Sequence, residues 1–255
     1  GYGKLVGATQ IVELGEIETP IVLTGTLSAF RAADALVTWM LRQPGNEEMR
    51  SVNPVVGETN DGHLSDIRAR PITEAMVLEA LDGATDGPVT EGCVGAGAGT
   101  SALGFKGGIG TSSRVVVGTR VDTGSTPTEG FTVGVIVQSN FSGTLTVLGT
   151  PIPAPEDDEP EGNSCMIIVA TDAPLDSRQL DRVARRAVFA MGRVGAGFTH
   201  GSGDYALAFS TGQGDRIPDK DLDPFFAATM DAVEEALLDS VFTAETTHGV
   251  DGHVR

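Results

Sequence analysis

Apolar residues recur at helical spacing in four segments of the chain. In residues 29–41 they fall at Phe30, Ala33, Leu36, Val37 and Met40, which places them on one face of a helix. A proline and a glycine at positions 44 and 45 end this helix. Similar patterns predict helices over residues 73–81, 177–193 and 223–243.

Shorter apolar or alternating runs between the helices predict strands. They cover residues 1–14, 21–23, 55–56, 115–117, 131–138, 145–148, 166–170 and 205–210. Residues 57–66 form a polar loop. We expect 115–117 to pair with 131–138, and 145–148 to lie antiparallel to 131–138, since that connection is too short for a crossover helix. Helices grouped between runs of strands predict an α+β fold with two stacked sheets covered by helices. A chain of 255 residues is expected to form one domain.

The segment around Ser164 joins an acidic, proline-rich linker (151–160) to a short apolar run (166–170) that is typical of a strand buried on both faces. One interpretation is that Ser164 caps the linker, and the local residues alone favour it. The other is that the chain cuts itself before Ser164, which would give one residue both a hydroxyl nucleophile and an α-amino base. Cys165 is a rival nucleophile, but its side chain should point to the opposite face and act as inert core.

The chain is strongly acidic and poor in lysine. Its formal charge is −18, and Lys4, Lys106 and Lys220 are its only lysines. Such a surface repels nucleic acid and anionic membranes, so we expect neither partner. It is typical of proteins from a salt-rich cytoplasm, and equally of an ordinary acidic enzyme.

The chain shows no apolar run of membrane-spanning length and no leader at its start, so we expect a cytoplasmic location, with the periplasm as the alternative. Cys93 and Cys165 make neither a disulfide framework nor a metal-ligand spacing. The histidines at 63, 200, 248 and 253 are not in metal-ligand spacing either. We therefore expect no metal and no cofactor.

Glycine is densest in residues 91–114. Lys106 precedes Gly107 and Gly108 and no hydroxyl follows them, so the segment fails the phosphate-loop pattern, and it also fails the dinucleotide-binding spacing. What remains is a backbone that closely approaches either a substrate or a neighbouring strand. Further along, Ser202 and Asp204 lie two residues apart where a strand begins, so they form a simple turn or share a hydrogen-bond network that orients a nucleophile.

Five sequence blocks together resemble the L-aminopeptidase/D-esterase family, also called the DmpA-type or β-peptidyl aminopeptidases. They are VGETNDGHLSDIR (56–68), GFKGGIGTSSR (104–114), VIVQSN (135–140), NSCMIIVATDAPL (163–175) and GSGDYALAFST (201–211). The resemblance implies a four-layer α/β/β/α sandwich of two mixed sheets. It also implies self-cleavage between Asn163 and Ser164, giving fragments 1–163 and 164–255. The family pattern extends past both ends of the chain, so we expect a fragment of it.

The resemblance also implies roles for individual residues. Ser164 becomes the nucleophile, Asn140 stabilises the oxyanion, and Ser202 with Asp204 orients the nucleophile and its amine. The family acid is usually glutamate, so Asp204 would have a shorter reach. His63 stands where the family loop usually has a tyrosine that contacts the reacting carbonyl. Gly107 and Gly108 are expected to bind substrate.

The implied activity is hydrolysis of amide or ester bonds after the N-terminal residue of small peptides, peptide amides or amino-acid esters, by an enzyme that forms a homo-oligomer. The alternatives are an acyltransferase of the same architecture, which would use a threonine nucleophile, and an inactive homologue that acts as a binding or structural protein.

Overall fold

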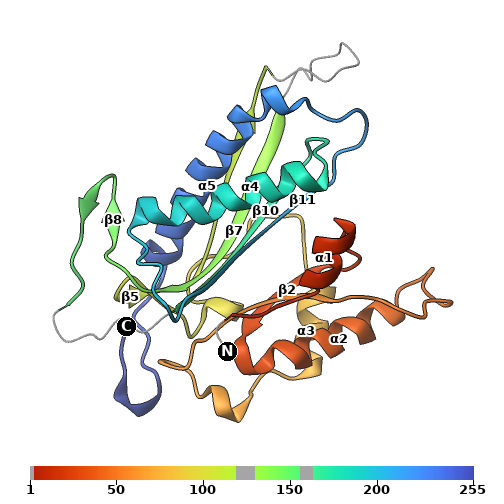
Figure 1. Ribbon diagram of the computed structural model, residues 1–255. Helices are drawn as coiled ribbons and strands as arrows, with labels where there is room; N and C mark the ends of the chain where they lie inside the picture. The colour runs from red at the N-terminus through yellow and green to blue at the C-terminus, as the bar shows by residue number, and fades with distance from the viewer. Residues whose placement is uncertain (1–2, 119–129, 156–162) are drawn as a thin grey trace.

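The protein is built in four layers, with two sheets stacked between two pairs of helices (Figure 1). The computed structural model describes residues 3–118, 130–155 and 163–255. The first sheet has the order β1 (Leu5–Val6), β3 (Val55–Thr59), β2 (Ile21–Gly25). The second has the order β11 (Gly203–Ser210), β10 (Asn163–Thr171), β7 (Phe131–Phe141), β6 (Ile109–Val116). Both sheets mix parallel and antiparallel pairs, which confirms the predicted α/β/β/α sandwich.

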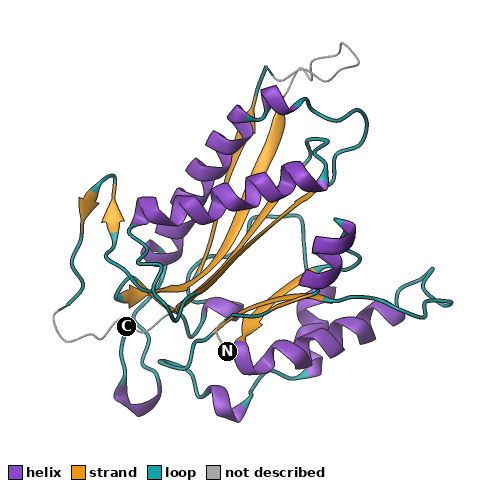
Figure 2. Ribbon diagram, viewed as in Figure 1, coloured by secondary structure: helices purple, strands orange, loops and turns teal. Residues whose placement is uncertain are grey.

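Helices cover the outer faces of both sheets (Figure 2). Helices α2 (Ala29–Leu41) and α3 (Glu74–Asp82) pack on the first sheet, and α4 (Ser177–Ala190) and α5 (Asp223–Phe242) on the second. The helix predicted from the apolar spacing of residues 29–41 is found with those bounds. The Thr73 hydroxyl caps α3, and a capping box of Asp176 and Gln179 begins α4, which a short 3-10 turn (Met191–Val194) extends.

The central strand β10 is buried on both faces, as its apolar run predicts. Cys165, Ile167 and Val169 belong to the core formed with α4 and α5. Ile168, on the other face, belongs to a smaller cluster with Val55 of β3, which lies between the two sheets. This double burial holds the beginning of β10 in a fixed position relative to both sheets.

Three predictions about local structure were wrong. Residues 1–14 are not one strand, because a left-handed Gly7 (φ 90°) follows β1 and opens a short helix, α1 (Ala8–Leu14). The segment predicted as a loop from residue 57 continues as strand β3 to Thr59. Residues 145–148 do not pair with β7. Instead β8 (Thr146–Val147) pairs with β9 (Thr150–Pro151) through a turn whose central residues, Leu148 and Gly149, both have positive φ.

The remaining strands are the short pair β4 (Ser101–Ala102) and β5 (Phe105–Lys106), which precedes β6. The predicted pairing of 115–117 with 131–138 is confirmed by the longer antiparallel ladder of β6 and β7. Residues 156–160 of the linker before Ser164 lie outside the described residues, as do residues 119–129 between β6 and β7. Of the helices that the structure describes, none is both long and apolar enough to cross a membrane.

Candidate active site

Ser164 lies near the beginning of β10, between two neighbouring strands and beneath a loop of the other sheet. The ladder places it opposite Asn140 of β7 and Gly203 of β11, and the residue is only 2% exposed. Its Oγ accepts a hydrogen bond from the backbone N–H of Asn60, at 3.2 Å. Asn60 follows directly after β3, so the two stacked sheets meet at this hydroxyl.

The Asn140 side chain is held in a single orientation by two hydrogen bonds. Its Oδ1 accepts the backbone N–H of Ser101 at 3.0 Å, and its Nδ2 donates to the carbonyl oxygen of Asn60 at 2.9 Å. The amide nitrogen therefore faces the Asn60 main chain, whose N–H also contacts Ser164. One hydrogen on this nitrogen is left over for a further acceptor.

Ser202 and Asp204 form the hydrogen-bonded pair that their spacing predicts. Ser202 Oγ donates to Asp204 Oδ2 at 2.7 Å, and Asp204 lies opposite Cys165 in the ladder. Burial raises the pKa of the Asp204 carboxyl, while hydrogen bonds from Ser202 and the Cys165 backbone act in the other direction. Its Oδ1 is buried with no hydrogen-bond partner among the described residues. A carboxylate oxygen is thus available beside the first residues of β10.

Cys165 has surroundings opposite to those of Ser164. It pairs with Ser139, not Asn140, and its fully buried side chain belongs to the core under α4 and α5. Burial, and to a smaller extent the Asp204 charge, raises the pKa of the Cys165 thiol well above its ordinary value. A neutral, buried thiol is a poor nucleophile, which agrees with the prediction that Cys165 is inert core.

The loop after β3 contains the predicted residue His63 and also Asn60, whose contact with Ser164 the sequence did not predict. His63 Nε2 lies 3.2 Å from Nδ1 of His253, and the two rings are nearly perpendicular with centroids 4.1 Å apart. The residue of this loop that contacts Ser164 is Asn60, through its main chain. The only sequence signal for it was its place in the 56–68 block. Whether His63 also contacts the reacting carbonyl stays a prediction.

Close backbone packing accounts for Gly107 and Gly108. A Cβ at position 107 would overlap the carbonyl oxygen of Ser139, and one at 108 would lie 2.5 Å from that of Gly92. This fits the neighbouring-strand interpretation, and substrate binding by the two glycines stays a prediction. Lys106 is buried and donates from Nζ to the carbonyl oxygens of Gly97 and Gly107, at 2.8 and 2.7 Å.

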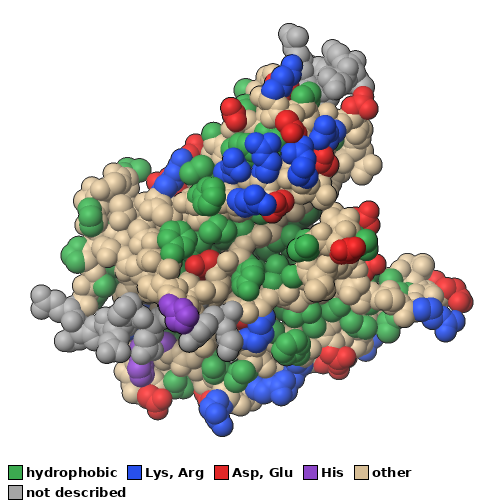
Figure 3. Space-filling model, in the orientation of Figure 1, with side chains coloured by type: hydrophobic (Ala, Val, Ile, Leu, Met, Phe, Trp, Pro, Cys, Tyr) green, Lys and Arg blue, Asp and Glu red, His purple; other side chains and the backbone are tan. Residues whose placement is uncertain are grey.

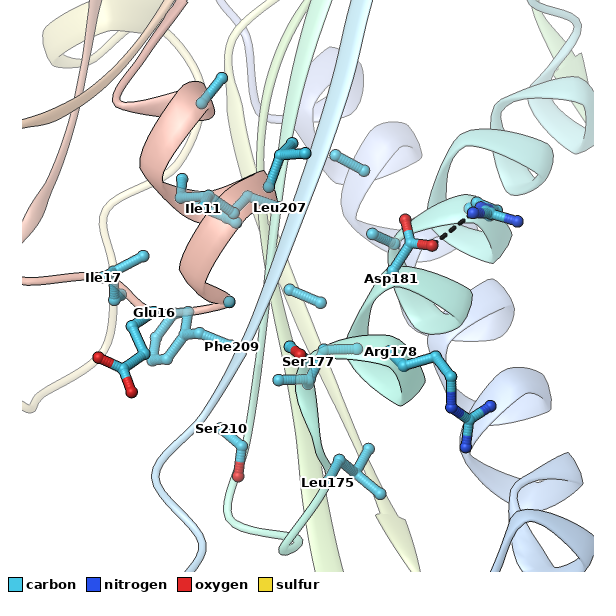
Figure 4. Close-up of a pocket in the computed structure, with 18 of the residues that line it drawn as sticks. Ile11, Glu16, Ile17, Leu175, Ser177, Arg178, Asp181, Leu207, Phe209 and Ser210 are labelled. Atoms are coloured by element: carbon cyan, nitrogen blue, oxygen red, sulfur yellow. Dashed lines mark hydrogen bonds and ion pairs between the residues drawn. The ribbon is translucent and has the colours of Figure 1, made fainter.

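Cavities also lie elsewhere among the residues that the structure describes. One of about 800 Å³ is bounded by α1, α4 and β11 (Figure 4). A larger one of about 1160 Å³ opens between the two sheets, and one of about 350 Å³ lies beside Asp61. Neither Ser164 nor Asn140 lines any of these, and the candidate site is described by its hydrogen bonds. Within the described ranges, no group of three or more His, Cys, Asp or Glu side chains is arranged to hold a metal ion.

Comparisons with known proteins give the family and the fold. The model of peptidase family S58 matches residues 1–255. The β-peptidyl aminopeptidase BapA of Sphingosinicella xenopeptidilytica is 37% identical over 284 residues, covering 98% of this chain and 69% of BapA. Two solved structures superpose with a TM-score of 0.88. The PH0078 protein from Pyrococcus horikoshii OT3 is 42% identical, covering 100% of this chain and 74% of that one. The L-aminopeptidase D-Ala-esterase/amidase from Ochrobactrum anthropi is 36% identical, covering 98% and 73%.

The Ochrobactrum enzyme is described as a prototype for the serine aminopeptidases and a new variant of the Ntn-hydrolase fold. The present protein has this fold, and the fold and the site together define it as a serine aminopeptidase of the N-terminal-nucleophile type. The chain belongs to peptidase family S58.

Proposed function

We propose that the protein cleaves its own chain between Asn163 and Ser164, and that the freed Ser164 hydrolyses amide or ester bonds after the N-terminal residue of small peptides, peptide amides or amino-acid esters. The observation that carries this proposal is the hydrogen bonding around Ser164 Oγ. A buried hydroxyl accepts a hydrogen bond from the Asn60 N–H, and the carbonyl oxygen of the same residue orients the Asn140 amide. The two products of cleavage would be residues 1–163 and 164–255.

In the self-cleavage step, Ser164 Oγ attacks the carbonyl carbon of Asn163. The hydroxyl proton passes to the peptide nitrogen, which leaves as the α-amine of Ser164, and an ester then joins the Asn163 carbonyl to Ser164 Oγ. Water hydrolyses this ester, which frees the carboxylate of Asn163 and the hydroxyl of Ser164. Strand β7 pairs with residues on both sides of the cut, and strand β11 pairs with β10 from Ser164 onward, so Ser164 is held in place during these steps.

In the hydrolysis of substrate, the α-amine of Ser164 takes the hydroxyl proton as Oγ attacks the carbonyl carbon. The remaining hydrogen of Asn140 Nδ2 stabilises the negative charge on the carbonyl oxygen. The leaving amine or alcohol takes up the proton, and water hydrolyses the acyl-enzyme. Asp204, which already accepts from Ser202, offers its unpartnered Oδ1 to the α-ammonium group of Ser164 in the protonated state.

The substrate is therefore a small molecule with a free amino group next to the scissile bond, and the protein is proposed to act as a homo-oligomer without a cofactor. The β-peptides that the name of BapA implies are one class to test, beside ordinary α-amino acid amides.

The test compares three proteins on an amino-acid p-nitroanilide. We expect the wild-type protein to release p-nitroaniline and Ser164→Ala to release none. Cys165→Ala is the matched control, since it removes the neighbouring nucleophile from the other face of the strand, and it should keep most of the activity. Full activity in Ser164→Ala, with loss in Cys165→Ala, would reverse the assignment.

A further inference from the structure

The last residues of the chain form a closed turn. Thr247 and Arg255 exchange two backbone hydrogen bonds, of 2.6 and 3.1 Å, and the Gly249 N–H donates to the His253 carbonyl oxygen at 2.8 Å. The 3-10 turn Val250–Gly252 lies between them. We refer to residues 247–255 as the C-terminal turn.

The C-terminal turn packs on the loop after β3, far away in sequence. The Val250 N–H donates to the Leu64 carbonyl oxygen at 3.0 Å, and a Cβ at Gly249 would lie 2.5 Å from that oxygen. His253 Nδ1 meets His63 Nε2 at 3.2 Å. The turn therefore holds residues 63 and 64 from one side through both backbone and side chains.

Hydrogen bonds within the loop connect these residues to the nucleophile. The N–H groups of Leu64 and Ser65 both donate to the Asp61 carbonyl oxygen, at 3.2 and 3.0 Å, and the Gly62 N–H donates to Asn60 Oδ1 at 3.2 Å. These bonds make residues 60–65 one compact unit. At the beginning of this unit, the Asn60 N–H donates to Ser164 Oγ and the Asn60 carbonyl oxygen accepts from Asn140 Nδ2.

We propose that the C-terminal turn, through Val250 and His253, positions the backbone N–H and carbonyl groups of Asn60 against Ser164 and Asn140. His253 is then a positioning residue for self-cleavage and hydrolysis, and it touches neither the substrate nor the nucleophile. This inference rests on the proposed function of Ser164. Its physical basis is that a displacement of about 1 Å at a reacting group costs up to about 10²-fold in rate.

The test uses three single variants. His253→Ala removes the contact with His63. His253→Asn restores a polar group at the place of Nδ1 and is the rescue variant. His248→Ala is the matched control, because His248 lies in the same turn but pairs with Val254 only through the backbone bridge. Each variant is measured for kcat, KM, the rate of self-cleavage and the midpoint of thermal unfolding.

We expect His253→Ala to lower kcat and the self-cleavage rate by about 10- to 100-fold, with little change in KM or the thermal midpoint. His253→Asn should recover much of the loss, and His248→Ala should behave as wild type. An unchanged kcat in His253→Ala, or an equal loss in His248→Ala, would overturn the positioning role while leaving the role of Ser164 intact.

Hydrogen exchange tests the same inference without relying on activity. Amides of residues 57–66 should exchange faster in His253→Ala than in wild type and in His248→Ala, because the loop loses its outer support. Unchanged exchange in this segment would overturn the proposal, whether or not the protein is active. A wild-type protein that neither cut itself nor hydrolysed any substrate would refute the proposed function separately.

Discussion

At the scale of single residues, the proposed function depends on which face of β10 a side chain occupies. Ser164 lies on the face that meets Asn60 and Asn140, and its neighbour Cys165 lies in the core. Asp204, opposite Cys165, is partly buried and has no ion-pair partner among the described residues, and burial raises the pKa of its carboxyl. Its protonation should therefore be visible in the stability of the uncut chain.

We predict that Asp204→Asn changes how the stability of the uncut chain depends on pH. Because the folded pKa of Asp204 is raised, the folded state binds this proton more tightly than the unfolded state. The charged group thus lowers the free energy of unfolding at neutral pH. This loss is recovered as the pH falls through the raised pKa toward the ordinary value of 3.8.

The measurement is urea unfolding of Ser164→Ala and of Ser164→Ala with Asp204→Asn, across a series of pH values. The single variant should gain stability relative to the double variant as the pH falls through this window. A constant difference between the two would mean that Asp204 titrates normally in the folded chain.

The structure brings together most of the residues that the resemblance of whole sequence blocks singled out. Ser164 and Asn140 meet across the β10–β7 ladder, and Ser202 meets Asp204, as expected. Asn60 was missed because its contact with Ser164 comes from the backbone N–H, which every residue type except proline carries. The contact between His63 and His253 could not be predicted either, because the two residues are 190 positions apart in the sequence.

At the scale of elements, the second sheet and its helices approach each other closely at particular glycines. A Cβ at Gly110 in β6 would overlap the carbonyl oxygen of Ala236 in α5. The neighbouring strand β7 contains Gly134, where a Cβ would meet nothing within 4 Å. Comparing substitutions at the two positions distinguishes the need for close packing at Gly110 from the general destabilising effect of glycine in a strand.

We predict that Gly110→Ala lowers the free energy of unfolding by about 1–3 kcal/mol, because helix α5 must move away from the sheet. Gly134→Ala should be neutral or raise it by up to about 1 kcal/mol, since alanine restricts the unfolded chain more than glycine does. Urea unfolding of both variants checks this. Equal losses would show that α5 does not pack directly on the β6 backbone.

Long periodic elements were predictable from sequence, and short ones were not. The apolar faces of α2 and α5 extend over several turns, so their spacing fixes the helix. Helix α1 has only seven residues, begun and ended by left-handed glycines, and its sequence also fits an alternating strand. The β8–β9 hairpin depends on a turn with positive φ at Leu148, which its residue type does not favour.

At the scale of the whole molecule, the charge is unevenly spread. The sequence carries a net −18, yet basic side chains gather over α4 in Figure 3. Arg178 and Arg185 of that helix pair with Asp219 and Asp181. Exposed ion pairs of this kind contribute little, so the excess of acidic groups elsewhere should dominate the response to salt.

We predict that added salt stabilises the protein at neutral pH. Raising NaCl from about 0.05 to 0.5 M shortens the screening length well below 10 Å and weakens the repulsion between carboxylates. The midpoint of thermal unfolding should rise, and the gain should shrink near the sequence pI of 4.4, where the net charge vanishes. A midpoint that falls with salt at neutral pH would mean that attractive pairs outweigh the repulsion.

The central claim is that Ser164 becomes the N-terminal residue of a catalytic fragment. Intact-mass analysis of the purified protein, with sequencing of the N-termini, tests it most directly. We expect two fragments that separate between Asn163 and Ser164, the second beginning Ser-Cys-Met-Ile-Ile, and a single uncut chain for Ser164→Ala. An uncut wild-type chain that still hydrolyses amino-acid amides, or a cut at another peptide bond, would contradict the account.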